Sequence, residues 1–306
     1  MKKISGAGYL CAMSTPHKAG FVNIFGAPNA GKSTLLNALL GEYLVITSPK
    51  VQTTRHRILG ILTEPGYQIV FSDTPGIIEP KYALHRKMMM QVKSALEDAD
   101  VAVLMHDITQ PMEEIEHIDA ELKLKVPVVL LLNKADLIKD TAELQRIKDA
   151  FQQRFPNYLV ETISAAGKKN LEKIIPFILE HLPEAPPFYP EDSMSDRSTR
   201  FFVSELIREQ IYHLFKEEIP YHAAVLIRSY EEKTTLDVIK ADIIVTRETQ
   251  KVILIGKGGT LIKKLGIEAR KKIEEFVGRK VHLELFVKVR PKWRDTDTYL
   301  SEYGYN

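Results

Sequence analysis

The chain has 306 residues, of which 44% are hydrophobic and 27% are charged, and its formal net charge is +2. This length predicts two domains, and the composition is that of ordinary globular proteins, which excludes a disordered or fibrous chain. The single cysteine, Cys11, excludes an internal disulfide. Because no apolar run is long enough to span a bilayer and the first residues lack the core of a signal peptide, we expect a cytoplasmic protein.

The first half of the chain has the pattern of an α/β domain. Between residues 21 and about 182, short β-branched apolar runs alternate with amphipathic helical segments, which predicts a mostly parallel sheet with helices on both faces. The expected strands are Phe21–Phe25, Arg57–Leu62, Tyr67–Phe71, Val101–Met105, Val126–Leu132 and Tyr158–Ile163.

A glycine-rich loop follows the first expected strand and opens a helix, and it matches the pattern G-x-x-x-x-G-K-[ST]. In such a loop the backbone N–H groups surround phosphates, while Lys32 reaches the outer phosphates and the Ser33 hydroxyl binds Mg²⁺. A purely structural glycine turn is the weaker interpretation. The nucleotide contacts expected here are Gly26, Ala27, Pro28, Asn29, Ala30, Gly31, Lys32, Ser33 and Thr34.

A polar connection before the second strand contains a candidate switch I, made of Gln52, Thr53, Thr54, Arg55 and His56. A threonine hydroxyl there can complete the Mg²⁺ shell only while a γ-phosphate is present. We favour Thr54 over Thr53 as this ligand.

The third strand leads into Asp73-Thr74-Pro75-Gly76 and then Ile77. The aspartate can hold Mg²⁺ through a water molecule, and the Gly76 N–H can meet the γ-phosphate. Many regulatory GTPases carry a glutamine at the position of Ile77 to orient the attacking water, and isoleucine cannot do this. We therefore expect slow hydrolysis that relies on the loops, an ion or a partner, and a binding module without hydrolysis is the alternative.

Two later motifs concern the base of the nucleotide. Asn133-Lys134-Ala135-Asp136 follows an apolar strand, where parallel sheets bind ligands. The Asp136 carboxylate can accept both N–H donors of guanine, a pair that adenine lacks, so the motif argues against a metabolic kinase. The Asn133 amide can donate to guanine and tether neighbouring loops. Ser164-Ala165, after the last strand, would bring a backbone N–H to the guanine carbonyl.

Residues 183–199 are rich in proline and form the expected linker to a second, smaller α+β domain. Its predicted order is α-β-β-α-α-β, with the first helix stopped by Pro220. The expected elements are the helix Arg200–Glu218, the strands His222–Ser229 and Thr235–Val245, the helices Glu248–Ile255 and Thr260–Phe276, and the strand Val281–Val289.

The end of this second half is basic. Between Gly256 and Arg294 there are 12 Lys or Arg against 4 Glu and no Asp, a balance of +8. Such a balance predicts a polyanionic partner, with a solvated charged surface as the plainer alternative. Ile262 and Leu265 are expected mainly in the core, and Trp293 could equally stack on a base or cover the core.

Gly256-Lys257-Gly258-Gly259 joins the last two helices, and a Gly-x-x-Gly turn in this element order resembles the type II KH domain. The resemblance implies a loop that approaches the backbone of single-stranded RNA. The RNA contacts expected are Gly256, Lys257, Gly258, Gly259, Lys263, Lys264, Arg270, Arg290 and Lys292, and Lys271 and Lys272 add charge beside them.

The order of the nucleotide motifs resembles the translation-factor-related GTPases, and the whole of residues 19–293 resembles the Era family of bacterial ribosome-assembly GTPases. The resemblance implies a slow, Mg²⁺-dependent GTP switch that binds the 3′ end of small-subunit ribosomal RNA and assists assembly of the small ribosomal subunit. Peripheral association with the inner face of the cell membrane is a further expectation.

The resemblance suggests one further ligand and shows one departure from the family pattern. In some relatives an asparagine at the position of Asn29 binds K⁺, although a role in stabilising the loop explains the residue equally well. Residues 1–18 form a longer N-terminal extension than the family pattern leads us to expect, with Met13 as an alternative start. The expected domains are thus the extension 1–18, a GTPase domain 19–182, the linker 183–199 and a KH-type domain 200–306.

Overall fold

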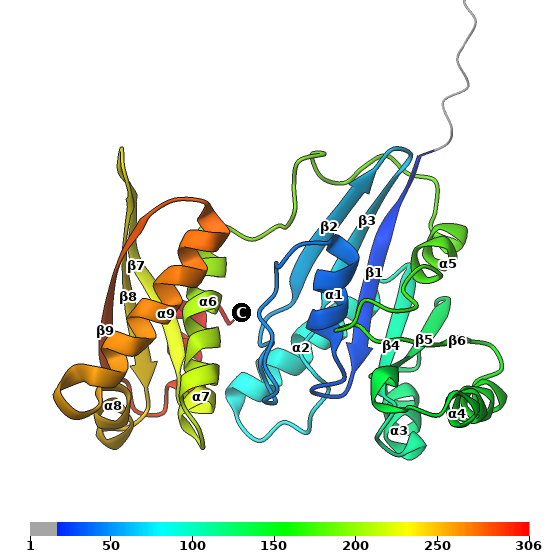
Figure 1. The fold of residues 1–306 in the computed structure, drawn as a ribbon, viewed down its shortest axis with the longest axis horizontal. Helices are drawn as coiled ribbons and strands as arrows, with labels where there is room; N and C mark the ends of the chain where they lie inside the picture. The colour runs from blue at the N-terminus through cyan, green and yellow to red at the C-terminus, as the bar shows by residue number, and fades with distance from the viewer. Residues whose placement is uncertain (1–16, 306) are drawn as a thin grey trace, which may run out of the picture.

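A computed structural model describes residues 17–305 of the chain (Figure 1). The predicted N-terminal extension, with Cys11 and Met13, lies outside the described residues except for His17 and Lys18. Lys18 already belongs to strand β1, Lys18–Gly26. Among the described residues, none of the helices has the length and apolar character needed to cross a membrane.

The first domain is built on a six-stranded sheet in the order β2-β3-β1-β4-β5-β6, which confirms the predicted mostly parallel α/β fold. The hairpin of β2 and β3 is the antiparallel exception, because only Pro65 and Gly66 join the two strands and a parallel crossover needs a dozen or more residues. Gly66 has a φ of 95°, which this tight turn requires. The other strands are β2 (Ile58–Glu64), β3 (Tyr67–Asp73), β4 (Val101–Asp107), β5 (Val128–Asn133) and β6 (Leu159–Thr162).

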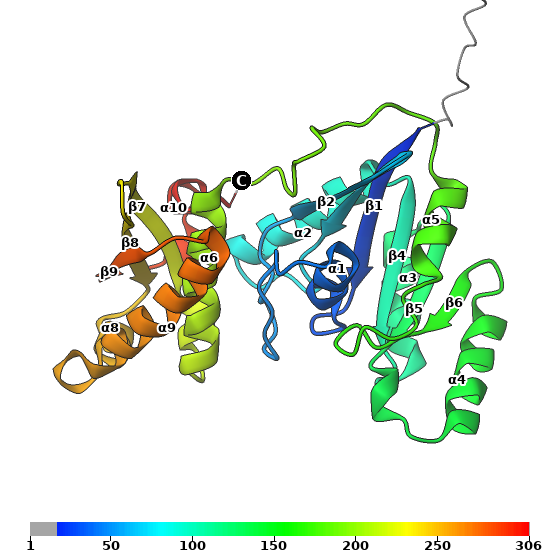
Figure 2. The same ribbon diagram turned by 45° about the horizontal axis from the view of Figure 1, so that its top comes forward.

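Helices cover both faces of this sheet (Figures 1 and 2). Leu35 and Leu36 of α1 share one buried apolar cluster with Ile178 of α5, and Val92 of α2 shares the opposite cluster with α3 and α4. The carboxyl ends of the parallel strands stay uncovered, and the loops that follow them form the rim of the site described below. The helices are α1 (Lys32–Leu40), α2 (Ala83–Glu97), α3 (Met112–Leu122), α4 (Thr141–Arg154) and α5 (Ile174–His181), with a 3₁₀ turn η1 (Ala135–Leu137) after β5.

The segment 183–199 connects the domains and also protects the edge of the sheet. The N–H of Ile61 in β2 donates to the carbonyl of Met194 at 3.0 Å, and the Ser195 hydroxyl donates to the carbonyl of Leu59. An uncovered edge strand would offer unpaired backbone groups to other chains. The linker thus pairs the outer edge of β2.

The second domain contains the predicted α-β-β-α-α-β order, with α7 and α10 as additional short helices, and a three-stranded sheet, β7-β8-β9. Helices α6 and α9 pack on one face of the sheet through a buried cluster that includes Ile207 and Ile273. The elements are α6 (Thr199–Leu214), α7 (Ile219–His222), β7 (Ala224–Glu232), β8 (Asp237–Val245), α8 (Glu248–Ile255), η2 (Lys257–Gly259), α9 (Thr260–Val277), β9 (Val281–Val289), η3 (Trp293–Asp295) and α10 (Asp297–Glu302).

Two predicted boundaries in this domain are wrong. The helix expected over Arg200–Glu218 ends at Leu214, and Pro220 lies in the first turn of the separate helix α7. Proline is tolerated in a first turn because the N–H it lacks would have no partner inside the helix. His222, expected in a strand, is the last residue of α7.

The two domains share an apolar contact. Leu84 and Met88 of α2 belong to one buried cluster with Trp293 and Leu300, which lie near the C-terminal end of the second domain. Figure 2 shows α6 and the C-terminal end of the chain turned toward the first domain. Trp293 has no exposed surface, so the structure places it in the core rather than on an RNA-binding surface.

Candidate functional site

The phosphate loop joins β1 to α1 at the edge of a pocket of about 530 Å³. Gly26 has a φ of 146°, and a Cβ there would lie 2.3 Å from the carbonyl of Met105, so only glycine fits this turn. The predicted residues that line the pocket are Pro28, Asn29, Gly31, Lys32, Ser33, Thr34, Gln52, Thr53, Thr54, Gly76, Asn133, Lys134, Asp136 and Ser164.

Lys32 lies in the phosphate loop with its ammonium group held by backbone oxygens. Nζ donates to the carbonyl of Gly26 at 3.0 Å and to that of Ala27 at 2.8 Å. Burial lowers the pKa of Lys32 to about 8, and the nearby Asp73 carboxylate opposes this effect. A bound phosphate would add negative charge next to this ammonium and favour its charged form.

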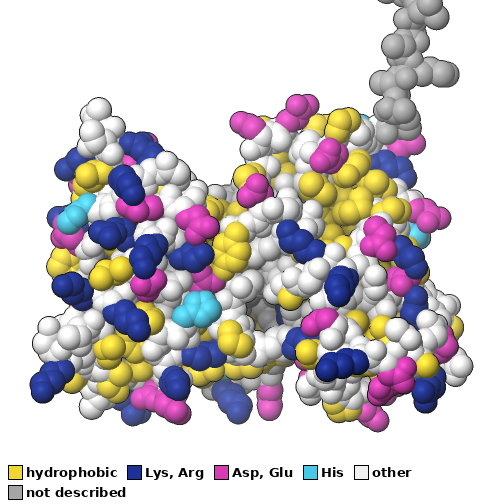
Figure 3. Space-filling model, viewed as in Figure 1, with side chains coloured by type: hydrophobic (Ala, Val, Ile, Leu, Met, Phe, Trp, Pro, Cys, Tyr) yellow, Lys and Arg dark blue, Asp and Glu magenta, His cyan; other side chains and the backbone are white. Residues whose placement is uncertain are grey.

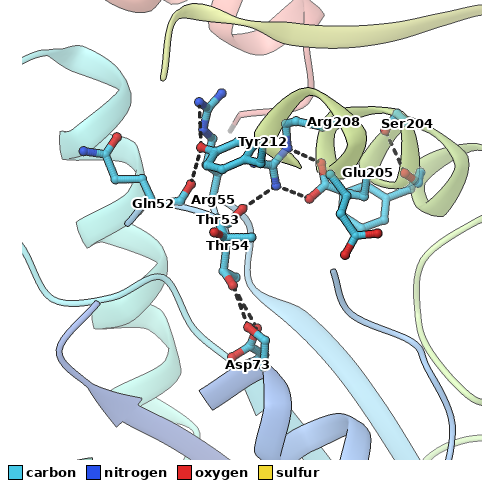
Figure 4. A network of polar contacts seen from close by, with 12 residues as sticks. Gln52, Thr53, Thr54, Arg55, Asp73, Ser204, Glu205, Arg208 and Tyr212 are labelled. Carbon is cyan, nitrogen blue, oxygen red and sulfur yellow. Dashed lines mark hydrogen bonds and ion pairs between the residues drawn. The ribbon is translucent and has the colours of Figure 1, made fainter. Parts of the chain in front are cut away.

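The three residues predicted to hold Mg²⁺ are joined by hydrogen bonds at the pocket, and Figure 4 shows Thr54 pointing to Asp73. The Ser33 hydroxyl donates to Asp73 Oδ2 at 2.7 Å, and the Thr54 hydroxyl donates to the same oxygen at 3.1 Å. Ser33 Oγ and Thr54 Oγ1 lie 2.8 Å apart. Thr53 instead donates to the carbonyl of Lys50, so Thr54, and not Thr53, joins this cluster.

This oxygen cluster fits a magnesium ion. Asp73 is fully buried, and its Oδ1 atom has no hydrogen-bond partner among the described residues. Burial raises the pKa of Asp73 to about 6, while hydrogen bonds from Ser33 and Thr54 and the charge of Lys32 oppose the rise. A small hard cation prefers such carboxylate and hydroxyl oxygens, and its charge would stabilise the ionised aspartate.

The segment after Asp73 approaches the phosphate loop closely. A Cβ at Gly76 would lie 2.8 Å from backbone atoms of Pro28, so the loop packs against a bare backbone. The Ile77 N–H donates to the carbonyl of Gly26, and the Ile77 side chain packs on the apolar cluster around Phe25 instead of lining the pocket. Ile77 therefore orients no water, as its side chain predicts.

Asn133 links the phosphate loop to the segment after β6, at the end of the pocket where the base would bind. Its amide donates to the carbonyl of Ala30 in the phosphate loop at 2.8 Å and accepts from the N–H of Ala165 at 2.9 Å. Asp136 is exposed in the pocket and is available to a base. The N–H of Ala165, predicted to meet the guanine carbonyl, is taken by Asn133, and Ala166 rather than Ala165 lines the pocket.

Asn29 stabilises the loops in this structure. Its amide donates to the carbonyl of Pro49 at 2.9 Å and so links the phosphate loop to the segment before Gln52. Its φ is 62°, a conformation that asparagine tolerates better than most residues. Of the two roles left open by the sequence, this contact favours the loop-stabilising one.

Sequence reasoning missed part of the pocket. Residues 46–49 belong to the same connection as Gln52, so their position next to the switch was the available signal. His213 comes from α6 in the second domain, and nothing in its local sequence indicates this position. The missed lining residues are Ile46, Thr47, Ser48, Pro49, Ile78, Met88, Leu137, Ala166 and His213.

Several predicted residues do not line the pocket. One of them, the buried Thr74, donates from its hydroxyl to the carbonyl of Ile24 in β1. Arg55 and His56 turn toward the second domain instead, and Arg55 donates to the carbonyls of Pro220 and Ala223 at 2.8 Å. The residues outside the lining are Gly26, Ala27, Ala30, Arg55, His56, Asp73, Thr74, Pro75, Ile77 and Ala165.

The Gly-x-x-Gly loop forms the 3₁₀ turn between α8 and α9. Gly256, Gly258 and Gly259 all have positive φ values, of 73°, 59° and 77°, which explains the glycines. A Cβ at Gly258 or Gly259 would meet no atom within 4 Å, so this backbone is open to a ligand.

A groove of about 350 Å³ lies between α9 and β9. Leu265 is fully buried, as predicted, and the half-buried Ile262 packs against the same apolar cluster while it also lines this groove. Among the predicted RNA contacts, Lys263 and Arg270 line the groove, while Lys257, Lys264, Arg290 and Lys292 are exposed outside it. The other lining residues are Gly266, Ile267, His282, Leu283 and Leu285.

The cations of α9 are not equivalent. Lys271 and Lys272 form ion pairs with Glu268 and Glu275 on the same helix, which reduces their value as phosphate contacts. In the space-filling view, Lys and Arg side chains are spread over this face of the second domain, and a recess separates it from the first domain (Figure 3).

Comparisons with known proteins agree with the nucleotide pocket of the first domain and the Gly-x-x-Gly loop of the second. A family model described as 50S ribosome-binding GTPase matches residues 21–134, and a KH domain model matches residues 218–294. The GTPase Era of Geobacter metallireducens is 42% identical over 294 residues, which cover 95% of this chain and 98% of that protein. The chain belongs to the Era family of GTPases. It is an enzyme that hydrolyses GTP, with a P-loop GTPase domain followed by a KH domain.

Other Era proteins show the same extent of similarity. The GTPase Era of Nostoc sp. is 41% identical and covers 94% of this chain and 90% of that protein. A crystal structure of Era in complex with MgGDPNP and nucleotides 1506–1542 of 16S ribosomal RNA superposes with a TM-score of 0.90, at 40% identity over 94% of this chain and 99% of that one. An Aquifex aeolicus Era variant bound to GDP and AlF₄⁻ gives the same TM-score, identity and coverage.

Proposed function

We propose that this Era-family GTPase uses its nucleotide state to control binding of the 3′ end of small-subunit ribosomal RNA, and that it assists assembly of the small ribosomal subunit. The observation that carries the proposal is the TM-score of 0.90 with an Era bound to MgGDPNP and 16S ribosomal RNA nucleotides. The open Gly-x-x-Gly backbone beside a groove supports the same function.

We propose Mg²⁺ as the cofactor of the nucleotide site. Ser33 and Thr54 would hold the ion through their hydroxyls, and Asp73 would hold it through water, because these three side chains already share hydrogen bonds. The ion would supply charge neutralisation at the phosphates. Lys32 would contact the outer phosphates, and Asp136 would accept from guanine.

Potassium is a separate proposal, because Asn29 has an explanation without it. If Asn29 holds K⁺, replacing K⁺ by Na⁺ slows hydrolysis in the wild type and leaves the rate of Asn29→Ala unchanged. A wild-type rate that is equal in both salts would eliminate the potassium ion.

Two further expectations also stay proposals. One is the set of domain boundaries 19–182, 183–199 and 200–306. The other is the cytoplasmic location with peripheral membrane association.

Single-turnover GTP hydrolysis, measured with and without an oligonucleotide of the 3′ end of 16S ribosomal RNA, tests the combined function. We expect slow hydrolysis that responds to the RNA, because Ile77 provides no water-positioning group. Absence of hydrolysis in both conditions would leave an RNA-binding module without enzymatic activity.

A matched pair of glycine variants tests the RNA site. Gly258→Asp places a carboxylate where a phosphate must approach, so RNA affinity should collapse while GTP affinity stays unchanged. Gly278→Asp is the control, because Gly278 also has a positive φ, of 68°, and open space around it, but lies at the far end of α9. If both variants bind RNA like the wild type, the loop is not the RNA site.

The charge contribution is tested separately by salt dependence. Replacing Lys263 and Lys264 by alanine should weaken binding to all single-stranded sequences and lower the slope of log affinity against log salt by roughly 0.7 per lost phosphate contact. Replacing Lys271 and Lys272 is the control, since both lysines already pair with glutamates. Equal losses in both pairs would indicate only a general basic surface.

A further inference from the structure

The candidate switch I and the residues just before it are held by the second domain at several points. Glu209 of α6 accepts from the N–H of Thr47 at 3.1 Å, and Lys50 donates to carbonyls at the end of α6. The Tyr212 hydroxyl donates to the carbonyl of Gln52 at 2.8 Å. The conformation of this segment therefore depends on a helix that lies more than 140 residues later in the chain.

Arg208 makes the contact nearest to the proposed metal ligands. Its Nη2 atom donates to the backbone carbonyl of Thr53, as Figure 4 shows. Arg208 is only 1% exposed, and the carboxylate of Glu205 holds the guanidinium through Nε at 2.8 Å and through Nη2. The Tyr212 ring lies 5.4 Å from the guanidinium carbon. A guanidinium held in this way has few alternative orientations, so its bond to the switch is preorganised.

The carbonyl of Thr53 and the N–H of Thr54 belong to one planar peptide group. A hydrogen bond to the Thr53 carbonyl therefore fixes the orientation of this peptide plane and the position of the Thr54 Cα. This limits the directions in which the Thr54 hydroxyl can point. In the structure this hydroxyl points to Ser33 and Asp73. The preceding carbonyl, of Gln52, is held by the same helix, so the main chain on the N-terminal side of Thr54 is anchored twice.

We propose that Arg208 is a positioning residue for the nucleotide site: oriented by Glu205, it holds the Thr53 carbonyl and thereby aims the Thr54 hydroxyl at the metal ion. The inference rests on the proposed role of Thr54 as a Mg²⁺ ligand. It makes the second domain a structural part of the GTP-bound site. His213 from the same helix lines the pocket, which agrees with this role.

The test is a Mg²⁺ titration of the full chain in complex with a non-hydrolysable GTP analogue and, separately, with GDP. Thr54 can bind the ion only with the γ-phosphate present, so Arg208→Met should weaken Mg²⁺ binding with the analogue by about 10-fold to 100-fold and leave Mg²⁺ binding with GDP unchanged. A purely structural defect would affect both nucleotides. Thr54→Ala should show the same selective loss, and the double variant should lose no more than Thr54→Ala alone.

Arg200→Met is the matched control, since Arg200 lies exposed on the same helix and contacts the Tyr230 carbonyl of its own domain. Its titrations should match the wild type. If Arg208→Met fails to fold because it leaves Glu205 without its partner, Arg208→Met with Glu205→Leu removes both buried charges and keeps the test available.

The outcomes distinguish the role of Thr54 as a metal ligand from the role of Arg208 as a positioning residue. Selective loss in Arg208→Met and Thr54→Ala without additivity supports the positioning role. Selective loss in Thr54→Ala with a normal Arg208→Met overturns that role and leaves the metal site intact. A normal Thr54→Ala overturns the metal ligand itself, and with it the role of Arg208. Equal loss with both nucleotides in Arg208→Met also overturns the positioning role.

Discussion

Replacing Trp293 by alanine should destabilise the protein without weakening RNA binding. Trp293 has no exposed surface, and its indole N–H donates to the carbonyl of His222 at 3.0 Å. Its ring packs against Tyr303, with centroids 5.7 Å apart, and belongs to the cluster that also holds Met88 of the first domain. The side chain therefore supports both the second domain and its contact with α2.

The magnitude follows from the burial. A buried tryptophan removes about 150–250 Å² from water, which at about 25 cal/mol per Å² corresponds to about 4–6 kcal/mol. Because alanine keeps a small part of that contact, we expect a loss of about 4 kcal/mol in the free energy of unfolding, within the usual range of about 3–5 kcal/mol. Trp293→Phe should cost about 2 kcal/mol, since it retains a ring but leaves the His222 carbonyl without its donor.

Urea unfolding followed by circular dichroism measures both losses, and fluorescence tests the alternative. Trp293 is the only tryptophan in the chain, so its emission reports one environment. We expect a buried indole whose emission is unchanged by a single-stranded RNA oligonucleotide. A cost below about 1 kcal/mol for Trp293→Ala, together with quenching by RNA, would refute the burial argument and support base stacking.

Three further changes have clear expected outcomes. Asp136→Asn should weaken GTP binding and shift preference toward xanthine nucleotides, because the amide reverses one donor and acceptor pair; competition between GTP and XTP measures this, and an unchanged GTP preference would contradict the base pocket. Gly76→Ala should lower affinity for a GTP analogue more than for GDP. Its Cβ would lie 2.8 Å from the backbone of Pro28, so the Gly76 N–H would be displaced from the γ-phosphate that it is expected to meet. Equal losses of affinity for the two nucleotides would contradict that contact. Burial, with the charges of Arg208, Arg197 and Arg55, lowers the pKa of His56 to about 4, so the unfolded chain binds the proton more tightly than the folded protein. Stability should therefore be full above pH 6.5 and fall by about 3 kcal/mol as the pH drops toward 4; His56→Gln should lack this part of the slope in urea unfolding, and parallel slopes would contradict it.

The parts of the molecule whose geometry is encoded locally could be predicted from the order of its amino acids. The phosphate loop could be predicted because its glycines, Lys32 and Ser33 act through their own backbone turn and the helix that follows. The six strands and the order α-β-β-α-α-β follow from residue periodicity, which each element carries within its own sequence. The metal-binding role of Thr54 stays a prediction, although its hydroxyl lies beside Ser33 and Asp73 as the order of the motifs indicates.

Contacts between residues that are distant in the chain became visible only in the folded protein. Pro220 opens a new helix instead of ending the long one, because a first turn accepts proline and the chain bends there to reach β7. Trp293 became a core residue only through its contacts with α2 and the C-terminal tyrosines. His213 lines the nucleotide pocket and Arg208, held by Glu205, contacts the Thr53 carbonyl, yet the local pattern of their helix shows only an ordinary amphipathic segment. Contacts between domains depend on how two folded surfaces fit together, and no periodicity within either segment records that fit.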